Sequence, residues 1–117
     1  MNELMIKYAR VLLKVCLKID RNQPLFISYN LEREDFIRII VNEALKLGVN
    51  DIYLEGIDSQ IKHDELLHLS VEDLKKSTYF NKSIWNTYAK KNAAFLMIAS
   101  ENPGLMKDID PNKLKEI

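Results

Sequence analysis

Apolar residues recur every three or four positions at the start of the chain, which predicts a helix over residues 3–19. The side chains expected on its buried face are Leu4, Tyr8, Val11, Leu12, Val15 and Ile19. Four basic residues fall on the opposite side of this helix: Lys7, Arg10, Lys14 and Lys18. One basic stripe on a protein of zero net charge is typical of a solvated helix face. Asn2 precedes the helix and can cap it through its side-chain oxygen.

A strand, a helix and a second strand come next. Residues 25–29 are a short run of apolar and aromatic side chains, which predicts a strand buried on both faces. The helical period returns over residues 32–47, and Gly48 stands where a left-handed residue commonly ends a helix. Residues 51–55 form the second predicted strand, which Gly56 ends. Because all of this fits within about thirty residues, the pattern predicts a βαβ unit with parallel strands.

Residues 58–92 carry a helical but broken pattern, which predicts three short helices. The first holds Leu66, and the third holds Trp85. Between them, the sequence Ser-Val-Glu-Asp at residues 70–73 is typical of a capping box, in which a hydroxyl and a carboxylate bond to each other's backbone amides. The second helix is therefore expected to begin near Leu74.

The third apolar run, residues 93–99, has polar and turn-forming flanks and predicts a buried, central strand. The sequence thus predicts an α/β fold of three layers, in which helices flank a short, mostly parallel sheet. The strands of that sheet are expected at about residues 25–29, 51–55 and 93–99.

The pair Asp110-Pro111 begins a last helix, because an N-cap residue is followed by proline at the first helical position. A helix of so few residues would be marginal alone. We therefore expect the chain to be the N-terminal piece of a longer protein. It should fold alone and expose an apolar patch where the rest of that protein docks.

The composition is that of one globular domain. The chain has 117 residues, enough for a single buried core, and 47% of them are apolar. Seventeen basic residues balance seventeen acidic ones, whereas a nucleic-acid-binding protein commonly has a basic excess. No apolar run approaches the roughly 18 residues that span a bilayer, and the N-terminus lacks the order of a signal peptide. These features predict a cytoplasmic protein that binds neither nucleic acid nor membrane.

The densest group of candidate metal ligands is His63, Asp64, Glu65 and His68. A zinc-protease helix places two histidines four residues apart, so that both imidazoles share one face. Here the separation is one residue longer, which turns the second ring about 140° away from the first. Asp64 and Glu65 are spaced to reach His68, but two ligands are too few for a catalytic zinc site. The pattern favours a surface helix with acid–histidine pairs.

Two other kinds of site find little support. Cys16 is the only cysteine, which excludes an internal disulfide, and its place beside Val15 in a helix predicts a buried, inert thiol. Residues 29–34, directly after the first strand, contain no glycine. The close backbone approach that a phosphate-binding loop needs is therefore missing.

Ligands of α/β sheets commonly lie at the carboxyl ends of the strands. Asn30, Glu55, Glu101 and Asn102 stand there and are weak candidates for a binding site. Helix caps and turns account for the same residues equally well, and Asn30 can cap the helix that follows it. The sequence therefore assigns no catalytic, cofactor-binding or metal-binding residue to this chain.

One set of residues runs in a recognisable order through nearly the whole chain. Its members are Leu4, Tyr8, Ala9, Leu12, Val15, Ile19, Gln23-Pro24-Leu25, Ala44, Gly48, Tyr53-Leu54-Glu55, Ala93-Ala94-Phe95-Leu96, Ile98, Glu101-Asn102-Pro103, Leu105 and Asp110-Pro111. In this order the chain resembles the N-terminal region of the thermophilic-type metallo-aminopeptidases, the aminopeptidase T and aminopeptidase S family. Asn22 departs from the family pattern, which often has lysine and glycine around that turn.

The resemblance implies that residues 1–117 are the N-terminal α/β domain of a longer aminopeptidase, without its C-terminal catalytic domain. Such enzymes release N-terminal amino acids from peptides with two divalent metal ions, zinc or cobalt. The ligands are glutamates, histidines and an aspartate of the catalytic domain, none of which this chain matches. The N-terminal domain helps to enclose the substrate cavity in a homodimer. This chain is therefore expected to supply scaffold and cavity wall, to bind no metal and to be inactive alone.

The alternative is a stand-alone binding or interaction module of flavodoxin-like or response-regulator-like type. A phosphoacceptor module of this type carries acidic residues just after its first strand and an aspartate at the end of its third. Here Glu32 and Glu34 come slightly late, and Glu101 stands in place of that aspartate.

Overall fold

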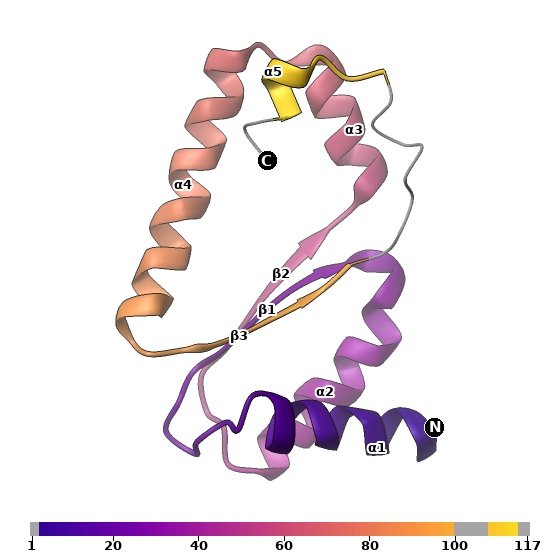
Figure 1. Cartoon of the computed structure of the whole chain (residues 1–117), viewed down its shortest axis with the longest axis vertical. Helices are drawn as coiled ribbons and strands as arrows, with labels where there is room; N and C mark the ends of the chain where they lie inside the picture. The colour runs from indigo at the N-terminus through magenta and orange to yellow at the C-terminus, as the bar shows by residue number, and fades with distance from the viewer. Residues whose placement is uncertain (1–2, 100–107, 115–117) are drawn as a thin grey trace.

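The computed structural model describes residues 3–99 and 108–114, so that the predicted cap Asn2 and the candidates Glu101 and Asn102 lie outside the described residues. The molecule is flat, with extents of 43 × 32 × 17 Å (Figure 1). In chain order its elements are α1 (Glu3–Val11), the π-helical turn η1 (Leu12–Cys16), β1 (Leu25–Asn30), the 3₁₀ turn η2 (Leu31–Arg33), α2 (Glu34–Lys46), β2 (Ile52–Ile57), α3 (Ser59–His68), α4 (Val71–Lys90), β3 (Ala94–Ile98) and α5 (Pro111–Leu114).

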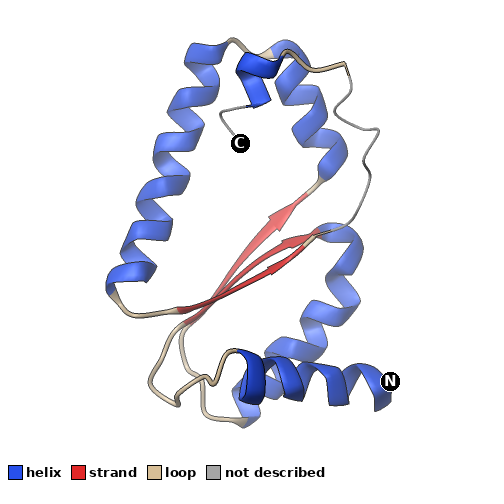
Figure 2. Cartoon of the chain, viewed as in Figure 1, coloured by secondary structure: helices blue, strands red, loops and turns tan. Residues whose placement is uncertain are grey.

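The three described strands form one parallel sheet in the order β2-β1-β3, which confirms the predicted α/β class (Figure 2). In the register of this sheet, Ile27 of β1 pairs with Leu54 of β2 and Leu96 of β3. β1 is the central strand, and Phe26 and Ile27 are fully buried. The prediction that residues 93–99 form the central strand is wrong. The connection through α3 and α4 returns the chain to the far side of β1, which leaves β3 at an edge.

Helices lie on both faces of the sheet, as the three-layer prediction requires, although α4 covers only part of one face. On one face, Leu13 of η1 and Ile40 of α2 share a buried core with Leu25 and Ile27 of β1. On the other face, the end of α4 brings Trp85 close to Phe26, with ring centroids 4.6 Å apart. Alternate residues of β1 point to opposite faces, so the same strand serves both layers.

The buried face of α1 differs from the one predicted. Ala9 and Leu13 are fully buried, whereas Leu4, Tyr8 and Val15 are 72%, 59% and 62% exposed. Small Ala9 shares a buried core with Ile40 and Ala44 of α2, and the π-helical turn η1 shifts the period of the residues after Val11. The larger apolar residues therefore form a stripe on the outer side of α1. We expected such an exposed patch, and its role in docking stays a prediction.

Gly48 ends the helix of the βαβ unit as predicted, with a left-handed φ of 92°. Gly56, in contrast, lies inside β2 and does not end the strand, which continues to Ile57. A Cβ atom at Gly56 would stand 2.8 Å from the Leu31 side chain. Glycine therefore allows the turn after β1 to approach β2 closely.

α4 is one helix of 20 residues, so the prediction of separate second and third helices is wrong. The capping serine was predicted correctly, because the Ser70 hydroxyl accepts a hydrogen bond from the Asp73 amide at 3.1 Å. The apolar period lapses in the middle of α4, where Tyr79 and Phe80 are 78% and 65% exposed. A helix that packs only at its ends needs no continuous apolar face, and the sequence of α4 contains neither glycine nor proline to break it.

A second, smaller core lies at the far end of α3 and α4. It consists of buried Leu66, Leu74 and Ile109, with Leu69 packed against them. α5 follows this core, and the Asp110 carboxylate accepts a hydrogen bond from the Asn112 amide at 2.9 Å, which confirms the predicted helix start. In Figure 1, α5 lies beside α3 and α4 and away from the sheet.

Candidate functional site

Asn30, at the carboxyl end of β1, is a helix cap. Its side-chain oxygen accepts a hydrogen bond from the Glu32 amide at 3.0 Å, and its amide nitrogen donates to the Ser59 hydroxyl. Only 8% of the residue is exposed. Because its side chain holds η2 and α3 through one accepted and one donated hydrogen bond, Asn30 has the structural role of a helix cap, which the sequence offered as the alternative to a binding residue.

Glu55, on β2, is held by two neutral donors. The Ser28 hydroxyl donates to one carboxylate oxygen at 3.1 Å, and the indole nitrogen of Trp85 donates to the other at 3.2 Å. The sequence pattern indicated Glu55 as a weak candidate for a binding site, but it did not indicate the hydrogen-bond partners Ser28 and Trp85. Ser28 was inferable from strand alternation, since it lies two residues after Phe26 on the same face, whereas Trp85 comes from a helix far along the chain.

Two cavities adjoin Glu55, between α3, α4 and the carboxyl-terminal half of the strands. The larger has a volume of about 710 Å³ and reaches Ile61, Lys62 and Phe80. The smaller, of about 430 Å³, lies over the sheet between Trp85 and Met97. Glu55, Ile57, Lys62, Ser77 and Asn81 line both, so the two cavities adjoin, and together they are called the groove below. This groove is the candidate functional site of the chain.

The histidine cluster lies on α3, with His63 in the middle of the helix and His68 at its last residue. Nε2 of His63 lies 2.8 Å from Oδ1 of Asp108, and Nδ1 lies 3.6 Å from the Asp64 carboxylate. The hydrogen bond with Asp108 raises the pKa of His63 and lowers the pKa of Asp108. His68 is exposed. Among residues 3–99 and 108–114, no three histidine, cysteine or acidic side chains gather in a group that could hold a metal ion.

Acid–histidine pairing occurs at His63, as the sequence favours, but its main partner is distant in sequence. Asp108 belongs to the segment before α5 and was not considered from the pattern of α3 alone. The pair ties that segment to α3. It therefore has a clear structural role beside the second core.

Cys16 is exposed, so the prediction of a buried thiol is wrong. The residue ends η1, where the chain leaves the helix, and its neighbour Val15 is exposed as well. The helical face on which both were expected to be buried points outward.

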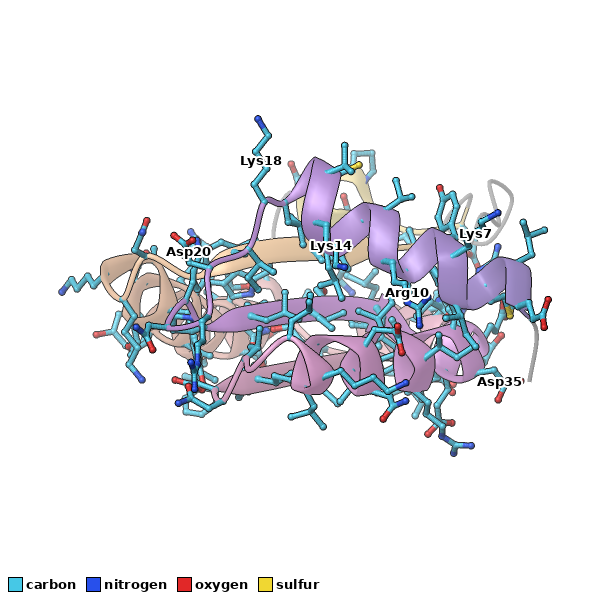
Figure 3. The ribbon with its side chains drawn as sticks, turned by 90° about the horizontal axis from the view of Figure 1, so that it is seen from below. Lys7, Arg10, Lys14, Lys18, Asp20 and Asp35 are labelled. Carbon is cyan, nitrogen blue, oxygen red and sulfur yellow. The ribbon has the colours of Figure 1, made fainter. Side chains whose placement is uncertain are left out.

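Among the described residues, Arg10 is the one member of the predicted basic stripe that forms an ion pair. Nε of Arg10 lies 2.5 Å from the Glu43 carboxylate of α2, and Nζ of Lys46 lies 3.0 Å from its other oxygen. Glu43 is only 4% exposed, and the hydrogen bond from Arg10 holds its pKa below the ordinary value. In Figure 3, Arg10 lies on the side of α1 that faces α2, whereas Lys18 projects away from the molecule.

No helix in the described parts of the chain is long and apolar enough to cross a membrane.

The whole chain, residues 1–117, matches the model of the thermophilic metalloprotease family (M29), and it belongs to this family. Aminopeptidase 2 of Geobacillus stearothermophilus is 31% identical to it over 108 residues, and Aminopeptidase AmpS of Bacillus subtilis is 26% identical over 112 residues. Each alignment covers 92% of this chain and 26% of the relative. The chain thus spans about a quarter of the length of the curated relatives that it matches.

The fold has a solved counterpart. The structure of wild-type AmpT from Thermus thermophilus superposes with a TM-score of 0.80 at 19% sequence identity, over 96% of this chain and 28% of that chain. At this identity, the likeness establishes the fold. The expected resemblance to the aminopeptidase T and aminopeptidase S family is therefore confirmed at the level of family and fold.

Proposed function

We propose that the chain, residues 1–117, is the N-terminal α/β domain of a metal-dependent aminopeptidase that releases N-terminal amino acids from peptides. The observation that supports this is the match of the whole chain to the metalloprotease family, together with relatives that are named aminopeptidases. The chain aligns with only 26% of those relatives, which supports a further, catalytic domain in the complete enzyme.

In this proposal, the metal ions bind outside the present chain. The described residues do not fit a metal centre, because they bring no three candidate ligands together. The complete enzyme holds divalent metal, proposed as two zinc or cobalt ions, on its C-terminal domain. This chain supplies scaffold and one wall of the substrate cavity, and by itself it is inactive.

The partners of the proposed enzyme follow from the same assignment. They are its own C-terminal domain, peptide substrates and a second copy in a homodimer. The proposed location is the cytoplasm. We propose no contact with nucleic acid, in line with zero net charge, and none with membranes.

The stand-alone module remains less well supported. Its phosphoacceptor form would need acidic side chains clustered at the strand ends, but Glu32 and Glu34 are exposed residues of η2 and the start of α2. A match to one peptidase family from residue 1 to residue 117 favours the enzyme domain.

Activity assays test this proposal. The 117-residue chain and the complete reading frame that encodes it are purified, and each is assayed with a leucyl reporter, with and without a chelator. We expect hydrolysis only with the complete product, suppressed by the chelator and restored by zinc or cobalt. Chelator-sensitive hydrolysis by the 117-residue chain, or its stoichiometric binding of zinc, would contradict the assignment of the metal site to another domain.

A further inference from the structure

Half of one sheet face is left open at the smaller cavity. Parallel sheets are normally covered on both faces. Here Trp85 and Tyr88 of α4 cover the first half of the strands through their contacts with Phe26. The second half faces the cavity of about 430 Å³, and Met97 is 70% exposed there. The cavity stands at the carboxyl ends of parallel strands, where α/β proteins bind small ligands.

A carboxylate is held in a fixed position at this cavity. Ser28, which is 5% exposed, and the Trp85 indole each bind one oxygen of Glu55. The Trp85 ring is itself fixed by stacking on Phe95, with centroids 5.2 Å apart. Within the described residues, Glu55 forms no ion pair. Each oxygen keeps acceptor capacity for a second donor, so the site can accept hydrogen bonds from a cation.

Two cations line the same cavity. Lys62 and Lys82 contribute to its wall, and neither forms an ion pair with a described acidic residue. Lys62 and Glu55 thus share a cavity without neutralising each other. Apolar groups of Leu74, Trp85 and Met97 lie around them. A cavity with a fixed anion, separate cations and an apolar wall complements a small zwitterion that carries an apolar group.

We propose that this cavity binds a free α-amino acid with an apolar side chain. Its ammonium group donates to Glu55, and its carboxylate lies toward Lys62 and Lys82. Its side chain packs against Trp85 and Met97. The proposal depends on residues of this chain alone and holds whether or not the chain is part of a peptidase.

The single tryptophan provides a direct measurement, since Trp85 is the only one in the chain and its indole donates to Glu55. The chain is titrated with L-leucine while the indole N–H resonance and the fluorescence are followed, and calorimetry gives an independent affinity. We expect saturable binding with a Kd of the order of 1 mM, as for a ligand of so few atoms. Leucinamide lacks the carboxylate and N-acetyl-leucine lacks the ammonium, so each should bind about tenfold more weakly.

Three variants test the assignment of charges. Glu55→Gln should weaken leucine binding about tenfold or more, whereas Glu65→Gln, which removes the same charge from the larger cavity only, should leave it unchanged. Lys82→Gln should weaken the binding of leucine but not of leucinamide. Circular dichroism confirms that each variant is folded.

Four outcomes would overturn the proposal. The first two are the absence of saturable leucine binding to the unaltered chain and an equal leucine affinity in Glu55→Gln. The third is tighter binding of leucyl-leucine than of leucine, which would make the cavity a peptide site. The fourth is a change of oligomeric state in Glu55→Gln, which would make the cavity an interface between copies of the chain.

Discussion

Glu43 is a charged residue in the apolar core between α1 and α2. It is 4% exposed, and its carboxylate binds Arg10 of α1 and Lys46 of α2. A buried carboxylate destabilises a fold unless cations or hydrogen bonds compensate its lost hydration. Arg10 therefore joins α1 to α2 by a link that depends on the ionised form of Glu43.

We expect Glu43→Gln to lower the melting temperature at neutral pH and to flatten the loss of stability in acid. The pKa of Glu43 is lowered in the folded chain, chiefly by the hydrogen bond from Arg10. Its contribution is therefore present above the ordinary value of 4.5 and is lost as the pH falls through the folded value. Melting temperatures of both chains, measured from about pH 3 to pH 7, cover the range in which carboxylates titrate and test this pH dependence.

Glu34→Gln is the matched control for Glu43→Gln. It breaks the exposed pair between Glu34 and Arg38, at 3.3 Å on the surface of α2. Exposed pairs contribute little to stability. Equal shifts of the melting temperature in the two variants would refute a special role for Glu43.

The contact of His63 with Asp108 should stabilise the chain only in a window of pH. The pKa of His63 is raised by the hydrogen bond with Asp108, so its contribution is full below 6.5 and is lost as the pH rises through the folded value. The pKa of Asp108 is lowered by the same bond, so its contribution is present above 3.8 and is lost as the pH falls through the folded value. The contact is therefore strongest between these two values.

Asp108→Asn tests this window. The difference in melting temperature between this variant and the unaltered chain should be largest between the ordinary pKa values of the two groups and should shrink in alkaline solution. Asp64→Asn, which removes the more distant acidic neighbour at 3.6 Å, is the control and should have a smaller effect. A difference that does not change with pH would contradict the charged contact.

At the scale of elements, α1 shows which of two apolar stripes a helix buries. The stripe with the larger side chains faces outward, and the one built around Ala9 and Leu13 faces α2. Helix pairs that approach closely favour a small residue at the crossing. The sequence of α1 and η1 carries both stripes, and contact with α2 decides which of them is buried.

The two stripes predict opposite results for neighbouring truncations. Leu13→Ala should lower the free energy of unfolding by about 2–5 kcal/mol, because it leaves a cavity in the main core. Val15→Ala, at a residue that is 62% exposed, should change it by no more than about 0.5 kcal/mol. Urea denaturation measures both. A larger loss of stability in Val15→Ala than in Leu13→Ala would show that Val15 is on the buried face, as the sequence pattern predicts.

At the scale of the whole molecule, the chain is less compact than a typical domain of its length. The Cα radius of gyration is 16.1 Å, whereas a compact domain of this length has about 13 Å. α4 extends from the contact of Trp85 with Phe26 and Phe95 on the sheet to the second core, and the groove lies between these two ends. The described residues therefore form two separate cores joined by a long helix.

Small-angle X-ray scattering on the isolated chain should give a radius of gyration near 16.1 Å, and heating should give a single cooperative transition. A radius of gyration of about 13 Å would show that the groove closes in solution, and one of about 35 Å would show an unfolded chain. Either result would contradict an open but folded molecule.

Local chemistry made much of the fold predictable. The strand at Leu25, the left-handed Gly48 and the caps at Ser70 and Asp110 all follow from properties of a few adjacent residues. These properties act wherever the segment is placed: an apolar run avoids water, and a side-chain oxygen satisfies free amides of the first helical turn.

The candidate site was predictable only in part. The sequence pattern placed Glu55 in the second strand, which in the structure continues past it to Ile57, but its hydrogen bond from Trp85 joins residues that are 30 positions apart. In the same way, the pairing of His63 with Asp108 spans 45 positions. No periodicity within one element contains such a contact.

The sequence by itself determined the class of fold, the order and direction of the strands within the βαβ unit and the caps at Ser70 and Asp110, because backbone hydrogen bonding and local burial patterns depend on neighbours along the chain. The tertiary structure alone decided which face of α1 is buried, that β1 and not β3 is central, that Cys16 is exposed, and that Glu55 meets Trp85. These outcomes depend on which surfaces meet across the chain, and a surface is buried only when a partner of matching shape reaches it.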